Sequence, residues 1–170
     1  MCIRDSHKIN KNSKLWIVGH EIDTEIYAFE LRNLVKSLLL EHSVKFAGTV
    51  ANCELKAYFQ NSDLYMCMSE HEGFCVPLVE AMNFNLPVIA YNSSAIAETL
   101  GDAGLLVENK NHAEIAEAMN LMISDRSIRE EFHSKAKTQI EKFSKEVFEL
   151  RLKKLLEAKM LEDVSLKINA

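Results

Sequence analysis

The chain has 170 residues, of which 48% are hydrophobic and 26% charged, and its formal net charge is −5. These proportions are typical of a globular protein, and the length predicts one domain with room for a helical extension. The acidic balance argues against a protein that binds nucleic acid, because contact with a phosphate backbone needs a basic surface. No apolar run approaches the ~20 residues that span a membrane, so we expect no transmembrane segment.

Short apolar runs alternate with stretches of helical periodicity along most of the chain. The runs lack apolar–polar alternation, which indicates strands that are covered on both faces and pair in parallel. Parallel strands joined by helices form a doubly wound, Rossmann-like α/β sheet, in which ligands bind at the carboxyl ends of the strands. We expect one sheet whose strand ends at Gly19, Gly48 and Ser69 face a single cleft. Its strands are predicted at 15–18, 44–47, 64–68, 88–90 and 105–107, with helices at 23–40, 52–59, 77–84 and throughout the chain after Asn111.

The loop after the third predicted strand carries the most informative residues of the chain. Gly73 permits a sharp bend, and Pro77 is typical of the first turn of a helix. The N–H groups between them can point at one position, where the positive end of the helix favours a diphosphate. Glu72 lies in the loop beside this position, and Glu80 lies one turn inside the helix. Both carboxylates can accept hydrogen bonds from hydroxyl groups.

Residues 72–82, with the sequence EGFCVPLVEAM, resemble the signature of the family-four retaining glycosyltransferases, in which a Glu-Gly-Phe turn is followed by a second Glu. Asn85 stands where the family usually has Gly, and after Gly it is the residue that best tolerates a left-handed turn at a helix end. The resemblance implies the C-terminal, donor-binding half of a GT-B fold with a helical tail. It covers residues 15–143, since further segments match in order and spacing at 15–19, 44–50, 62–64, 87–90 and 101–107.

The resemblance also implies a role for each residue of the motif. Glu72 is the catalytic residue that binds the hydroxyl groups of the donor sugar, and Glu80 binds the ribose. The family needs no metal ion, other cofactor or protein nucleophile, because an oxygen of the donor phosphate takes the proton of the acceptor. The other donor-binding residues are Gly73, Phe74, Cys75 and Val76, whose N–H groups hold phosphate, and Gly48, Thr49 and Val50, which line the base pocket.

The function implied is transfer of a hexose from a nucleotide-diphosphate sugar to a glycan or lipid-linked acceptor. The resemblance places this reaction in the cytoplasm and, for a full-length protein, at the inner face of the membrane. Family members have a second lobe that binds the acceptor, and a glycine-rich strand with Arg and Lys that neutralise the leaving diphosphate. We expect an N-terminally truncated fragment, inactive alone, with a foreign leader at 1–6, a nucleotide-sugar-binding domain at 7–143 and a helical extension at 144–170.

Other functions stay open at the level of sequence. The chain could be a stand-alone nucleotide-sugar binding module, or a sugar-nucleotide epimerase of similar fold. Glu72 and Glu80 could be the acid pair of a glycosidase, or solvated surface acids. Cys67, His71 and Cys75 are evenly spaced, but no fourth zinc ligand is evident, and we expect no metal site.

Two further expectations concern packing. Apolar residues at helical spacing over 146–159 predict an amphipathic helix on this domain, although in the family such a helix crosses to the other lobe. The cysteines lack CxxC spacing and are interpreted as buried, reduced thiols: Cys2, Cys53, Cys67 and Cys75.

Overall fold

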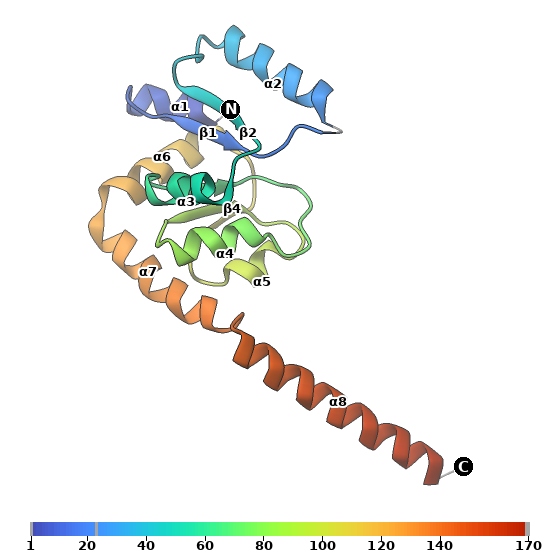
Figure 1. Cartoon of the computed structure of the whole chain (residues 1–170). Coiled ribbons are helices and arrows are strands. Elements are labelled where there is room, and N and C mark those ends of the chain that lie inside the picture. Colours follow the sequence, from blue (N-terminus) through green and yellow to red (C-terminus); the bar gives the residue numbers. More distant parts are fainter. Residues whose placement is uncertain (1, 23, 169–170) are drawn as a thin grey trace.

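The computed structural model describes residues 2–22 and 24–168, and side chains as far as Lys159. Strands and helices alternate up to β5, and the chain is helical beyond it (Figure 1). The sequence predicts this order except for two helices that it does not indicate, at residues 2–9 and 96–100. In chain order the elements are α1 (Cys2–Ile9), β1 (Leu15–Val18), α2 (Glu25–Ser37), β2 (Val44–Gly48), α3 (Asn52–Gln60), β3 (Tyr65–Cys67), α4 (Val76–Asn83), β4 (Val88–Tyr91), α5 (Ile96–Leu100), β5 (Leu105–Val107), α6 (His112–Ser124), α7 (Arg126–Glu141) and α8 (Lys145–Ile168).

All strand pairs in the described residues are parallel, which confirms the predicted α/β class. The strands form two sheets, however, one with the order β1-β2 and the other with the order β3-β4-β5. The expectation of a single sheet is therefore wrong for the residues that the structure describes. An apolar run identifies a strand, but hydrogen bonds between backbones decide its neighbours, and β3 pairs only with β4.

The main core lies around the three-stranded sheet. Val88, Ile89 and Ala90 of its central strand have no exposed surface, and neither have Leu78 of α4 or Ile96 of α5. Burial of each large apolar side chain contributes about 1.5–3 kcal/mol to folding. A central strand that is fully buried on both faces is the structure that non-alternating apolar runs predict.

A second, smaller core lies beneath the two-stranded sheet and includes Ile3, Val35 and Val44. Ile3 belongs to α1, which packs against α6, and its side chain is only 2% exposed. The expectation that residues 1–6 are a foreign leader stays a prediction, because a segment of any origin buries its apolar side chains where a surface accepts them.

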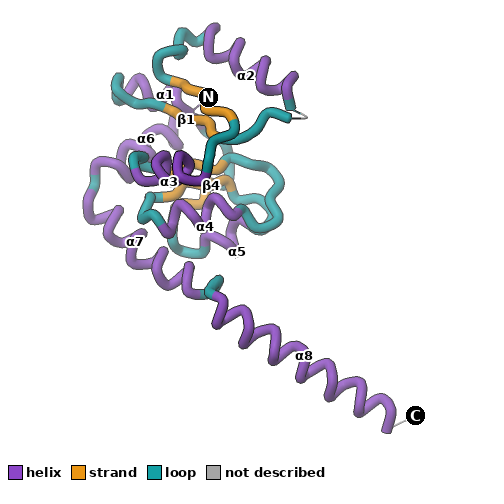
Figure 2. The backbone as a smooth tube through the Cα atoms, viewed as in Figure 1, coloured by secondary structure: helices purple, strands orange, loops and turns teal. Residues whose placement is uncertain are grey.

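Helix α8 extends away from the rest of the chain, and its last turns lie far from both sheets (Figures 1 and 2). The expectation that residues 146–159 pack on this domain is therefore wrong. No helix within the described residues is long and apolar enough to cross a membrane. The large apolar side chains that α8 exposes are Phe148, Leu150, Leu152, Leu155 and Leu156.

The end of α4 confirms the expected left-handed turn. Asn85 has a φ of +58°, and the N–H of Leu86 donates to the carbonyl oxygen of Ala81 at 3.0 Å. This is the hydrogen-bond pattern that closes a helix when the residue after its C-cap is left-handed. The turn sends the chain directly from α4 into the buried strand β4.

Candidate functional site

The turn between β3 and α4 presents a row of backbone donors. Cys75, the N-cap of α4, has φ and ψ angles of +63° and +69°, and Pro77 lies in the first turn of the helix as expected. No side chain caps α4. Within the described part of the chain, no hydrogen bond uses the N–H groups of Gly73, Phe74, Cys75 or Val76. Unused N–H groups at the positive end of a helix favour an anionic ligand.

The loop between β4 and α5 holds this turn from the other side. The hydroxyl of Ser93 donates to the carbonyl oxygen of Ser69 at 2.7 Å. The N–H of Ala95 donates to the backbone carbonyl oxygen of Glu72 at 3.3 Å. Both donors follow β4, so the carboxyl ends of two neighbouring strands fix the position of Glu72. This arrangement confirms that the informative loop lies at the carboxyl edge of a parallel sheet.

Both predicted acids have free hydrogen-bonding capacity. Glu72 and Glu80 are half-buried, and neither carboxylate forms an ion pair or a hydrogen bond with any residue that the structure describes. Phe74 turns its ring away toward Phe143, and the two ring centroids lie 5.1 Å apart, edge to face. Two unpaired, half-buried carboxylates, on the loop and the helix that also carry the unused N–H groups, have the chemistry to bind a ligand that combines hydroxyl groups with an anion.

The residues predicted for the base pocket lie at the end of the other sheet. Gly48 closes β2 with a φ of +67°, and its carbonyl oxygen accepts the N–H of Gly19 at 3.0 Å. Thr49 is exposed and Val50 half-buried. No hydrogen bond in the described residues joins 48–50 to 72–76. Residues 48–50 therefore lie at the end of β2, but no hydrogen bond joins them to the loop that carries Glu72.

A pair of thiols lies directly under the loop. The sulfur atoms of Cys67 and Cys75 are 3.8 Å apart, and both residues are buried. The hydrogen bond from Cys75 lowers the pKa of Cys67 to about 6, and the same interaction, with burial, raises the pKa of Cys75. His71 is not part of this cluster, because its Nδ1 lies 3.3 Å from the hydroxyl oxygen of Ser94. Cys53 is exposed, so the expectation of burial is wrong for that cysteine.

Sequence analysis missed the grouping of the two thiols with Glu72. One ligand atom from each of Cys67, Glu72 and Cys75 lies within 4.8 Å of the other two. The signal that could have indicated this group is the separation of Cys67 and Cys75 by eight positions, from the end of a strand to the start of a helix. The even spacing with His71 pointed to the wrong third residue.

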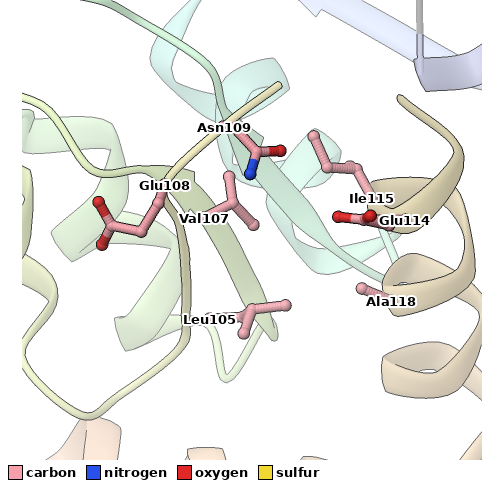
Figure 3. Close-up of a pocket in the computed structure, with 7 residues that line it drawn as sticks. All are labelled: Leu105, Val107, Glu108, Asn109, Glu114, Ile115 and Ala118. Carbon is pink, nitrogen blue, oxygen red and sulfur yellow. The ribbon is translucent and has the colours of Figure 1, made fainter. Parts of the chain in front are cut away.

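Two cavities of the chain lie outside the predicted site. One of about 370 Å³ is lined by Trp16 and Tyr58 among others. The other, of about 240 Å³, lies between β5 and α6 (Figure 3). Neither of these two cavities is lined by a predicted site residue. The residues that line the smaller cavity are Leu105, Val107, Glu108, Asn109, Glu114, Ile115 and Ala118.

Parallel strands joined by helices, with unused N–H groups and two free acids near the carboxyl ends of the strands, place the domain in the α/β class. Comparison with known families then identifies the kind of protein. Residues 3–139 match the family described as "Glycosyl transferases group 1", and the chain belongs to that family. Membership favours a transferase over an epimerase of similar fold.

Relatives with curated names include an uncharacterised glycosyltransferase of Haemophilus influenzae, which is 30% identical over 132 residues (76% of this chain and 36% of that protein). A second is the Campylobacter jejuni N-acetylgalactosamine-N,N'-diacetylbacillosaminyl-diphospho-undecaprenol 4-alpha-N-acetylgalactosaminyltransferase, which is 29% identical over 148 residues (85% of this chain and 39% of that protein). The chain thus spans about a third of the length of these relatives.

Solved structures show the same architecture. The C-terminal domain of LpcC, a glycosyl transferase group 1 family protein of Francisella tularensis, matches with a TM-score of 0.66 and 26% identity, covering 82% of this chain and 75% of that one. Alr3699/HepE of Anabaena, solved in complex with UDP-glucose, matches with a TM-score of 0.72 and 23% identity, covering 89% of this chain and 44% of that one. The chain has the fold of one lobe of a GT-B glycosyltransferase, which confirms the expected fold class.

Proposed function

We propose that this chain is the donor-binding domain of a retaining glycosyltransferase that takes a hexose from a nucleotide-diphosphate sugar. The observation that carries the proposal is the set of unused N–H groups at the start of α4, flanked by two unpaired carboxylates. An anionic diphosphate matches the N–H groups, and sugar hydroxyls match the acids. Proteins similar to this chain support this class of substrate, since they include mannosyltransferases and a structure solved in complex with UDP-glucose.

The proposed roles follow the chemistry of each group. The N–H groups of residues 73–76 bind the diphosphate and stabilise the negative charge that develops as the sugar leaves. Glu72 accepts hydrogen bonds from the sugar hydroxyls and holds the sugar in position for transfer. Glu80 accepts hydrogen bonds from the ribose, and Gly48, Thr49 and Val50 line the base pocket.

The transfer itself is proposed to retain the configuration of the sugar. The acceptor hydroxyl attacks the anomeric carbon on the face that the diphosphate leaves, and a phosphate oxygen of the donor takes its proton. The bond from the anomeric carbon to the acceptor oxygen forms as the bond to the diphosphate breaks. This scheme needs no protein nucleophile and no metal cofactor.

The acceptor is proposed to be a glycan or lipid-linked sugar, bound by a second lobe outside these 170 residues. The chain spans about a third of its relatives, and positioning of both substrates supplies much of the rate of such a reaction. We therefore expect the 170 residues alone to bind a donor but to transfer its sugar very slowly. The complete enzyme would act in the cytoplasm, at the inner face of the membrane.

Separate substitution of the two acids tests the proposal. Glu80→Ala should weaken binding of UDP and UDP-glucose, or GDP and GDP-mannose, alike, because its partner is the ribose. Glu72→Ala should weaken binding of the sugar conjugate and spare the bare nucleotide. Loss of one hydrogen bond to a charged group costs about 1.5–3 kcal/mol, or about ten- to a hundred-fold in affinity.

NMR titration of each variant with the bare nucleotide and with the sugar conjugate measures these effects. The buffer contains a metal chelator throughout. Glu70→Ala is a matched control, because Glu70 lies in the same loop but pairs with Lys110 at 2.8 Å. Equal losses of bare-nucleotide affinity in the Glu72 and Glu80 variants would contradict the roles. Unchanged binding in both variants would exclude the site.

A further inference from the structure

The thiols of Cys67 and Cys75 serve no step of the proposed transfer, yet the fold brings them together with a carboxylate. Cys67 ends β3, Cys75 begins α4, and Glu72 lies in the loop between them. Both cysteines are less than a tenth exposed. One sulfur atom from each cysteine and one carboxylate oxygen of Glu72 lie within 4.8 Å of one another.

The distance between the sulfurs matches tetrahedral metal coordination. Two metal–sulfur bonds of about 2.3 Å at the tetrahedral angle place the sulfur atoms about 3.8 Å apart. The observed distance is 3.8 Å. With a metal–oxygen bond of about 2.1 Å, the carboxylate oxygen would lie about 3.6 Å from each sulfur. The ligand atoms lie within 4.8 Å of one another, so the carboxylate oxygen of Glu72 would have to approach the sulfurs by at most about 1.2 Å to complete this geometry.

A disulfide suits the geometry less well. Its sulfurs lie about 2.05 Å apart, so two buried side chains would have to close by nearly 2 Å.

We propose that Cys67, Glu72 and Cys75 form a binding site for a thiophilic divalent cation such as Zn²⁺, with water as the fourth ligand. Each thiol that binds the cation gives its proton to solvent, and no electron is transferred. The site does not depend on the proposed function. One consequence does rest on the proposed function. A cation bound to the Glu72 carboxylate would prevent it from accepting hydrogen bonds from the sugar hydroxyls, so the cation and the donor sugar exclude each other.

Titration of the full chain with Co²⁺, under a reductant that contains no thiol, tests the site. Tetrahedral thiolate coordination of Co²⁺ gives intense visible absorption and a sulfur-to-metal charge-transfer band. We expect one equivalent of Co²⁺ to bind with these bands and Zn²⁺ to displace it. Cys67→Ser and Cys75→Ser should each weaken Co²⁺ binding at least ten-fold, and Glu72→Gln should weaken it by a smaller factor. Cys53→Ser is the matched control and should bind as the wild type does, because Cys53 is exposed and outside the cluster.

A second measurement avoids variants that fail to fold. In the wild-type chain, Zn²⁺ should slow alkylation of Cys67 and Cys75, followed by mass spectrometry, and leave that of Cys53 unchanged. Binding that survives both cysteine substitutions, equal protection of all cysteines, or a mass lower by two hydrogens with no bound ion would overturn the proposal. The last result identifies a disulfide instead. Donor binding in the presence of chelator is measured separately, so failure of the metal site leaves the proposed function untouched.

Discussion

The side chain of Gln139 in α7 forms hydrogen bonds with the last turn of α5, and its replacement should measurably lower the free energy of unfolding of the domain. Its side chain is 5% exposed. The Nε2 group donates to the carbonyl oxygens of Glu98 at 2.8 Å and Thr99 at 3.0 Å. These carbonyl oxygens belong to the last turn of α5, where carbonyl groups have no N–H donor within the helix.

The expected loss follows from these contacts. Gln139→Met keeps the length of the side chain but leaves the carbonyl groups of Glu98 and Thr99 without a donor. Thr99 is buried, with 1% of its surface exposed. An unsatisfied buried acceptor costs about 1–3 kcal/mol. Since Glu98 is more exposed, we expect a total decrease in the free energy of unfolding of about 2–4 kcal/mol. Gln139→Glu should cost at least as much, because its carboxylate would face two carbonyl oxygens.

Urea unfolding followed by circular dichroism measures this loss. With a slope of about 2 kcal/mol per molar urea, the midpoint should fall by about 1–2 M. Gln60→Met is a matched control at an exposed helix end, and its midpoint should stay that of the wild type. A Gln139→Met midpoint within error of the control would refute the reasoning, because the two hydrogen bonds would then contribute nothing to stability.

Two further predictions concern stability. In Gly104→Ala the new Cβ would lie 2.6 Å from the carbonyl oxygen of Val88, in the central strand. This overpacking should lower the free energy of unfolding by about 1–3 kcal/mol in thermal melts, whereas Gly73→Ala, with nothing within 4 Å, should cost less. Asp125 caps α7, and hydrogen bonds from Ser127 lower its pKa from 3.8. The stability of this cap is therefore present above about pH 4 and lost as the pH falls further. The difference between wild type and Asp125→Ala in urea titrations should shrink from pH 5 to pH 2, and a constant difference would contradict the assignment.

The local features of the fold and site could be predicted from the sequence because each depends on neighbouring residues. Proline without an N–H suits the first turn of α4, and Asn85 tolerates a left-handed backbone. The buried strands are short apolar runs such as Val88–Tyr91. The loop of Glu72 follows such a strand directly, so its place at the carboxyl edge of a parallel sheet followed from chain order alone.

The tertiary structure alone decided features that depend on contacts between distant segments. The strands divide into two sheets because hydrogen-bond partners, and not apolar patterns, set strand order. The apolar residues of α8 are exposed because a helical period predicts an apolar face without identifying the surface that covers it. The side chain of Gln139 donates hydrogen bonds to two carbonyl oxygens about forty residues earlier in the chain. The left-handed backbone of Cys75 places its sulfur close to the sulfur of Cys67 and the carboxylate of Glu72. Residues far apart, or separated by a folded loop, meet only when the whole chain has packed.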